Sequence, residues 1–159
     1  MPGKVSNPRD LVLLLLADLL FVERRLAGEV LPALIGRVQD GALRAALKEH
    51  HEETKVHVTR LETAFRRLDA APSANLSRAF EGAVAQHDEV ARSIVDAGLA
   101  DRFHADAALH VEHYEIAGYR ALLRVAPAGV GEPLADTLRD EEQAVRTLEK
   151  TLGRLARAR

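Results

Sequence analysis

The sequence has 159 residues, and its 22 lysine and arginine residues against 24 aspartate and glutamate residues give a formal net charge of −2. This length suits a single domain, 1–159, that is large enough to bury a core. The mixed charges argue against a nucleic-acid-binding protein, which would carry a basic patch or stripe. Because the sequence contains no cysteine, disulfides, thiolate metal sites and cysteine nucleophiles are excluded.

Two helices are predicted in the first half of the chain. Asn7 is a good N-cap for the first, which extends to about residue 36, and Pro32 is expected to kink or end a segment of it. Asp40 caps the second helix, which extends to about residue 69.

Three more helices are predicted in the second half, and almost no strand. The third begins at Ser73 or Asn75 and fades in DAGLAD, residues 96–101. The fourth begins at Asp101 and ends at the sequence APAGVGEP. Pro133 opens the fifth, which continues to the C-terminus.

The segment LVLLLLADLLFV, residues 11–22, is the one stretch that resembles a targeting signal. It is too short to span a bilayer, Asp18 interrupts it, and no small-residue cleavage site follows. We therefore predict a buried helix in a cytoplasmic protein without a membrane partner. Because this helix is apolar nearly all round, we expect a second copy of the chain to cover the face left over, which makes a homodimer.

Polar residues interrupt the apolar face of four predicted helices near mid-length. In the fifth helix the apolar positions are Leu134, Leu138, Val145, Leu148 and Leu152. The position missing from this 4-3-4 spacing is Glu141. The interruptions in the other helices are Glu23 in the first, His50, Thr54 and His57 in the second, and Glu112 in the fourth.

The densest interruption is HHEETKVH, residues 50–57. On a helix, His50 and His57 lie within about 40° of the centre of the apolar face, and Glu53 lies at its edge. The intervening His51 points toward solvent. Two histidines and one carboxylate are therefore candidate ligands at the middle of this helix.

Two interpretations compete for these residues. A buried carboxylate is costly unless it is paired or bound to a cation. If each glutamate pairs with an arginine, the protein is a metal-free helical scaffold whose polar core fixes helix register or mediates oligomerisation. Interruptions at the same level in four helices favour a shared divalent cation, because clustered carboxylates repel one another. Ligand sets rich in oxygen and poor in nitrogen suit iron or manganese, with zinc as a third candidate.

The pattern departs from that of known two-metal bundles. In ferritin-like di-iron or di-manganese proteins, two helices each give a Glu and two give Glu-x-x-His. Here the second helix offers His50-x-x-Glu53 or Glu53-x-x-x-His57, and the fifth helix contains no histidine. Tyr119, one turn beyond Glu115, either forms a hydrogen bond with a carboxylate or fills the core.

A spacing repeats along the chain. Glu23 and Glu53 are thirty residues apart, and so are Glu112 and Glu142. Both pairs fall on two successive helices, as an internally duplicated helix pair would place them. The repeat makes Glu142, beside Glu141, an alternative ligand in the fifth helix.

Several motifs resemble the YciE/YciF family of ferritin-like bacterial stress proteins. They are VEHYEIAGY (111–119), ADLLFVERRLAGEVLPAL (17–34), EHHEETKVHVTRLETAF (49–65) and LADTLRDEEQAVRTLEKTLGRLA (134–156). The resemblance implies an all-α, ferritin-like antiparallel bundle of about five helices, commonly dimeric, with a dinuclear metal centre and no settled enzymatic activity. Such a class can perform redox chemistry with oxygen or peroxide.

The resemblance also implies a set of metal ligands. By position they are Glu23, His50, Glu53, Glu112, Glu115, Glu141 and Glu142. His57 stands where the family usually has glutamine, and it is expected to add a ligand.

Overall fold

The structure is a computed structural model that describes residues 4–157. These residues form α1 (Pro8–Arg25), the π-helical turn η1 (Leu26–Val30), α2 (Leu31–Arg37), α3 (Gly41–Arg67), α4 (Arg78–Ala91), α5 (Ala97–Leu123) and α6 (Ala128–Arg157). No strand occurs within this range. The all-α class predicted from the apolar periodicity is confirmed.

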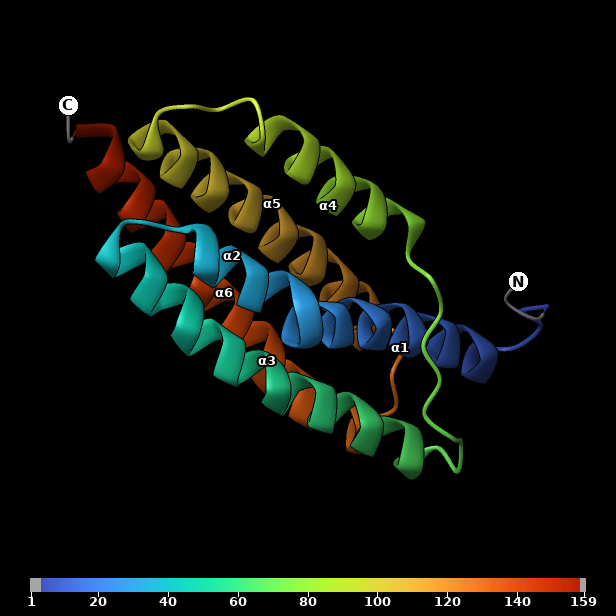
Figure 1. The fold of residues 1–159 in the computed structure, drawn as a ribbon. Helices are drawn as coiled ribbons and strands as arrows, with labels where there is room; N and C mark the ends of the chain where they lie inside the picture. Colours follow the sequence, from blue (N-terminus) through green and yellow to red (C-terminus); the bar gives the residue numbers. More distant parts are fainter. Residues whose placement is uncertain (1–3, 158–159) are drawn as a thin grey trace.

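Helices α1, α3, α5 and α6 form a four-helix bundle (Figure 1). Helices α1 and α6 each pack between α3 and α5 and run antiparallel to both. The chain returns from α3 to α5 through α4, which lies along the outside of α5 (Figure 1). Consequently α3 and α5 run in the same direction, and this single long crossover is the connection of ferritin-like bundles.

The first helix of the chain changes geometry before Pro32. In η1 the backbone N–H of Leu31 donates to the carbonyl of Leu26, five residues back instead of four. Pro32 then lies in the first turn of α2 and has no N–H to donate to the preceding turn. The Ala27 carbonyl in that turn lies 2.8 Å from Nε2 of His51 on α3. The expected boundary at Pro32 is therefore present as a π turn followed by a new α-helical segment.

The third predicted helix begins later than expected. Its first residue is Arg78, not Ser73 or Asn75. The Asn75 N–H donates to the carbonyl of Ala17, at 3.1 Å, so this segment is bound to α1 as a loop. A tertiary hydrogen bond therefore outweighs the local capping preference.

The fourth predicted helix begins earlier than expected, because its cap is Asp96. Asp101, the predicted cap, lies inside α5 and is buried. Its carboxylate accepts from the backbone N–H groups of Gln39 (2.9 Å) and Asp40 (2.6 Å). The acidic side chain thus caps the loop before α3 rather than its own helix.

The fifth predicted helix also begins earlier, at Ala128, so Pro133 lies within α6. A proline at this position leaves the carbonyl four residues earlier, that of Gly129, without its helical donor. The guanidinium of Arg67 on α3 donates to that carbonyl. This replacement explains why the proline does not start or break the helix.

Buried apolar side chains form two clusters toward opposite ends of the bundle. One contains Leu16, Leu19, Leu61, Phe65, Leu122 and Leu134. The other contains Val22, Leu26, Leu43, Leu47, Ala105 and Leu148. The polar residues singled out above lie between them along all four bundle helices. The apolar segment 11–22 contributes to the core, and within the described part of the chain no helix is long and apolar enough to cross a membrane.

The close approach of α1 and α5 requires a glycine at position 118. A Cβ atom there would lie 2.9 Å from Cδ2 of Leu19, whose side chain is 1% exposed and has little room to move. We expect Gly118→Ala to lower the free energy of unfolding by about 1 kcal/mol or more, because overpacking outweighs the gain in helix propensity. Chemical denaturation measures this change.

Gly82 on α4 is the matched control, because a Cβ atom there meets nothing within 4 Å. Gly82→Ala should raise the free energy of unfolding by about 0.5–1 kcal/mol. Equal stabilisation by both substitutions would show that α1 and α5 are not in tight contact at Gly118.

Candidate metal centre

Six of the predicted ligands lie together between the two apolar clusters. They are Glu23 on α1, His50 and His57 on α3, Glu112 and Glu115 on α5, and Glu141 on α6. All six side chains are buried, and none is more than 5% exposed. They form two groups that share Glu141.

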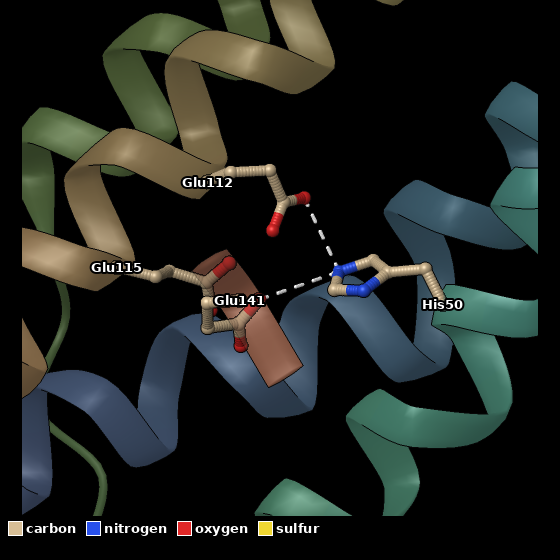
Figure 2. A group of neighbouring side chains, drawn as sticks. All are labelled: His50, Glu112, Glu115 and Glu141. Atoms are coloured by element: carbon tan, nitrogen blue, oxygen red, sulfur yellow. Dashed lines mark ion pairs between the residues drawn. The ribbon is translucent and has the colours of Figure 1, made fainter. Parts of the chain in front are cut away.

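The first group consists of His50, Glu112, Glu115 and Glu141, whose ligand atoms all lie within 4.8 Å of one another. Figure 2 shows the imidazole of His50 directed at the carboxylates that α5 and α6 contribute. His50 Nε2 lies 3.2 Å from Glu112 Oε1 and 3.9 Å from Glu141 Oε2. Glu112 and Glu115 reach the same point because residues three apart share a helix face.

The second group consists of Glu23, His57 and Glu141. His57 Nδ1 lies 2.9 Å from Glu141 Oε1 and 3.3 Å from Glu23 Oε1. The Tyr119 hydroxyl donates to Glu23 Oε1 at 2.5 Å, so the alternative of a hydrogen bond to a carboxylate holds for this tyrosine. Since Glu141 Oε1 faces His57 and Oε2 faces His50, one carboxylate joins two adjacent sites.

Eight buried nitrogen and oxygen atoms of these groups have no hydrogen-bond partner among residues 4–157. They are Nδ1 and Nε2 of His50, Nδ1 of His57, Oε2 of Glu112, and both carboxylate oxygens of Glu115 and Glu141. Buried polar atoms in folded proteins are nearly always paired. None of the lysine and arginine side chains in residues 4–157 forms an ion pair with Glu23, Glu112, Glu115 or Glu141. The cluster thus has the donor atoms of a cation site, and no lysine or arginine of the described residues neutralises it.

Burial and mutual repulsion raise the pKa values of three carboxyl groups in the cluster. Burial raises the pKa of Glu115 well above its ordinary value, and the nearby carboxylates of Glu23 and Glu141 raise it further. Burial likewise raises the pKa of Glu23. Burial raises the pKa of Glu141 to about 7, although the His57 imidazole, whose Nδ1 lies 2.9 Å from Oε1, opposes this. Protons therefore neutralise part of the charge when no metal is bound.

The pKa values of the two histidines are also raised, but here the carboxylates raise them and burial opposes the change. Burial alone would lower the pKa of His57, but the carboxylates of Glu141 and Glu23 raise it to about 10. Burial also disfavours the charged form of His50, yet the Glu112 carboxylate brings its pKa well above the ordinary value. Positive imidazolium rings thus compensate part of the negative charge in the absence of a metal.

Two predicted ligands lie outside the group of six. Glu53 is at the edge, with a side chain that is 39% exposed and an Oε2 atom 3.6 Å from His50 Nδ1. Glu142 points away from the core, and its Oε1 atom pairs with Nη2 of Arg120 at 2.7 Å. The thirty-residue repeat that suggested Glu142 therefore joins a core position to a surface position, and of the two adjacent glutamates Glu141 is the one in the core.

The cluster has an approach from solvent beside Glu53. A pocket of about 150 Å³ is lined by His50, Glu53 and Glu112 together with Gln143 of α6. Glu112 also lines a larger and mainly apolar groove, of about 560 Å³, between α2, α4 and α5. Of the first group, His50 and Glu112 are therefore open to a small molecule, whereas Glu115 and Glu141 line neither pocket.

Asp140 lies beside the cluster but was not predicted from the sequence. Asp140 lies next to Glu141 in sequence but about 100° away from it around the helix, so it falls outside the apolar stripe. Its Oδ2 atom nevertheless lies 3.3 Å from His57 Nε2. Asp140 also pairs with Arg60, one turn after His57 on α3, and this tertiary contact has no signal in the sequence.

A single-crossover four-helix bundle with carboxylates and histidines at its centre defines an all-α protein of the ferritin-like class. The chain belongs to the family described as a domain of unknown function, DUF892, whose sequence model matches residues 7–159. This match, together with the structural similarity to the stress protein YciF described next, confirms the resemblance to the YciE/YciF family.

Two solved structures share this fold. The stress protein YciF of E. coli superposes with a TM-score of 0.91 at 24% sequence identity, over 98% of this chain and 100% of that one. YcfI of Rhodopseudomonas palustris, for which a structural role has been suggested, gives a TM-score of 0.90 at 29% identity, over 94% of this chain and 97% of that one. A comparison with curated protein sequences found no match.

The raised pKa values predict that the metal-free protein becomes less stable as the pH rises. The contribution of Glu141 is complete below its ordinary pKa of 4.5 and is lost as the pH rises through about 7. That of His57 is complete below 6.5 and is lost as the pH rises through about 10. We expect the melting temperature of chelator-treated protein to fall by about 3 °C or more between pH 6 and pH 9, equivalent to about 1 kcal/mol.

Scanning calorimetry in buffers of equal ionic strength measures this dependence. The variant Glu141→Gln should show a smaller decrease over the same range, because it removes one of the titrating groups. A wild-type melting temperature that is constant or rises from pH 6 to pH 9 would contradict the prediction.

Proposed function

We propose that this protein binds one or two transition-metal ions at the centre of its bundle, as a stress-associated member of its family. Iron or manganese is the expected metal, with zinc as a further candidate. The observation that carries the proposal is the set of eight buried donor atoms without a partner. The residues that would hold the metal are Glu23, His50, His57, Glu112, Glu115 and Glu141, with Glu141 common to both groups and Glu53 at the entrance.

Electrostatics supports a cation at this place. Four carboxylates and two imidazoles share the buried volume. Repulsion between two carboxylate charges about 4 Å apart is about 4 kcal/mol at an effective dielectric constant of about 20. A divalent cation keeps the carboxylates ionised and removes this repulsion. A donor set dominated by oxygen, with one imidazole in each group, suits iron or manganese.

The chain's own residues provide what a reactive metal centre needs. Bound iron or manganese would supply redox chemistry with oxygen or peroxide. The Tyr119 hydroxyl fixes the orientation of Glu23, and the apolar clusters on either side exclude bulk water. The pocket beside Glu53 is large enough for water, dioxygen or peroxide.

The comparisons support the physiological part of the proposal. YciF, which shares the fold, is called a stress protein. We extend that role to this chain and place the protein in the cytoplasm. A peroxide-consumption assay on the iron-loaded protein tests the chemistry, with Glu141→Gln as the inactive comparison.

The metal-free scaffold is the competing function, and the structural role suggested for YcfI favours it. A scaffold with a polar core should pair its buried carboxylates with arginines. The arginines of the described residues pair elsewhere, for example Arg24 with Glu62 and Arg120 with Glu142. The arrangement of charges therefore supports the metal site over the scaffold.

Metal binding is tested by removing the metal and adding it back. We expect the chelator-treated protein to take up one or two Mn²⁺ or Fe²⁺ ions per chain, and its melting temperature to rise as they bind. Glu141→Gln should abolish uptake, because Glu141 contributes to both groups. Elemental analysis after dialysis and calorimetry measure the two effects.

Glu142→Gln is the matched control, since it changes the adjacent residue and removes only a surface pair with Arg120. It should bind metal as the wild type does. The scaffold function would be supported instead if the wild type held no metal and melted identically with and without chelator.

Homodimer formation remains part of the proposal. Residues 11–22 prompted it, but the chain itself buries Leu16, Leu19 and Leu20 of this segment and leaves Leu11 and Leu14 partly exposed. The surface left for a second chain is therefore smaller than an all-round apolar helix suggests. Light scattering at micromolar concentration should give the mass of two chains, and a monodisperse monomer would contradict the dimer.

A further inference from the structure

We infer that Asp140 is a positioning residue that holds His57 in the form able to bind metal through Nδ1. The inference rests on the proposed metal-binding function and concerns the group formed by Glu23, His57 and Glu141. The two ring nitrogens of His57 have different surroundings.

Nε2 and Nδ1 of His57 face opposite sides of the ring. Nε2 makes a hydrogen bond of 3.3 Å with Oδ2 of Asp140. Nδ1 points at Glu141 and Glu23, yet it has no hydrogen-bond partner of acceptable geometry. A carboxylate only accepts, so the proton of this hydrogen bond is on Nε2. A metal ion at Nδ1 requires this arrangement, because the nitrogen that binds metal carries no proton.

Asp140 is itself held in place. Nη1 of Arg60 donates to Asp140 Oδ2 at 2.7 Å and to the Thr137 hydroxyl at 3.1 Å. The side chains of Asp140 and Arg60 are partly exposed, 35% and 26% respectively. The pair therefore lies at the surface of the α3–α6 seam, on the far side of the His57 ring from the carboxylates. In this position Asp140 acts on the histidine and does not reach the metal.

The other histidine lacks such support. His50 Nδ1 lies 3.6 Å from Glu53 Oε2, and both of its nitrogens are without hydrogen-bond partners. The two groups thus differ in how well their histidine is oriented. Carboxylates that orient metal-binding histidines typically change metal affinity by about 10–100-fold when they are removed. Loss of Asp140 should therefore weaken one site and leave the other, which serves as an internal reference.

The test is a Co²⁺ titration of metal-free protein, followed by absorption spectroscopy and calorimetry. We expect Asp140→Asn to weaken one Co²⁺ site by about 10–100-fold and to change its visible spectrum. The site that contains His50 should keep its affinity. The melting temperature of the metal-free protein should change little, because Asp140 is partly exposed.

Two further variants separate orientation of His57 from general stability. Asp136→Asn removes an exposed acid one turn earlier on α6, paired only with Arg139 among the described side chains, and should titrate as the wild type does. Asp140→Glu keeps a carboxylate and should bind Co²⁺ more tightly at this site than Asp140→Asn does, even if the two variants differ in melting temperature.

The outcomes distinguish this inference from the function on which it rests. Wild-type protein that binds no Co²⁺ would overturn the metal-binding function, and the inference with it. Wild-type protein that binds Co²⁺, with Asp140→Asn titrating identically and giving the same spectrum, would overturn the positioning role alone.

Discussion

The position of Glu141 between two histidines is the constraint on which the rest of the centre depends. Its two oxygens face His57 and His50, so α6 must approach α3 and α5 closely at one level of the bundle. A carboxylate buried in this way is stable only with nearby positive charge. The surrounding imidazoles can supply that charge as imidazolium rings, and a bound cation would supply it more completely. The imidazolium rings therefore stabilise the buried carboxylates in the metal-free protein.

The apolar clusters on either side offset the free-energy cost of burying the charged groups. They contain large side chains from all four bundle helices, such as Phe65 and Leu134 at one end and Leu43 at the other. Burial of that surface stabilises the fold by an amount that offsets the desolvation of a few charged groups. Because both ends are rigidly packed, the level between them has little freedom to relax. The donor atoms are consequently held together before any ligand arrives.

The sequence allowed the bundle and most of the centre to be predicted, because burial leaves a periodic pattern. Gaps in the apolar stripes identified Glu23, Glu112 and Glu141 from spacing alone. Residues whose position depends on tertiary contacts were not predictable in this way. The start of α6 is one example, since it depends on Arg67 reaching a carbonyl from another helix. Asp140 is another, because its partner comes from α3 and no periodic pattern within α6 marks it.

The π turn between α1 and α2 carries one residue more than an α-helical turn would. That residue changes the angular phase of everything after it by about 100° relative to α1. This shift brings Leu31 onto the buried side, whereas in an uninterrupted α-helix it would lie roughly 90° from the centre of the buried face of α1. Shortening the turn by one residue would thus leave the sequence of both helices intact while turning Leu31 away from the core. The extra residue therefore lets Glu23 on α1 and Leu31 on α2 both face the interior of the bundle, although no loop separates the two helices.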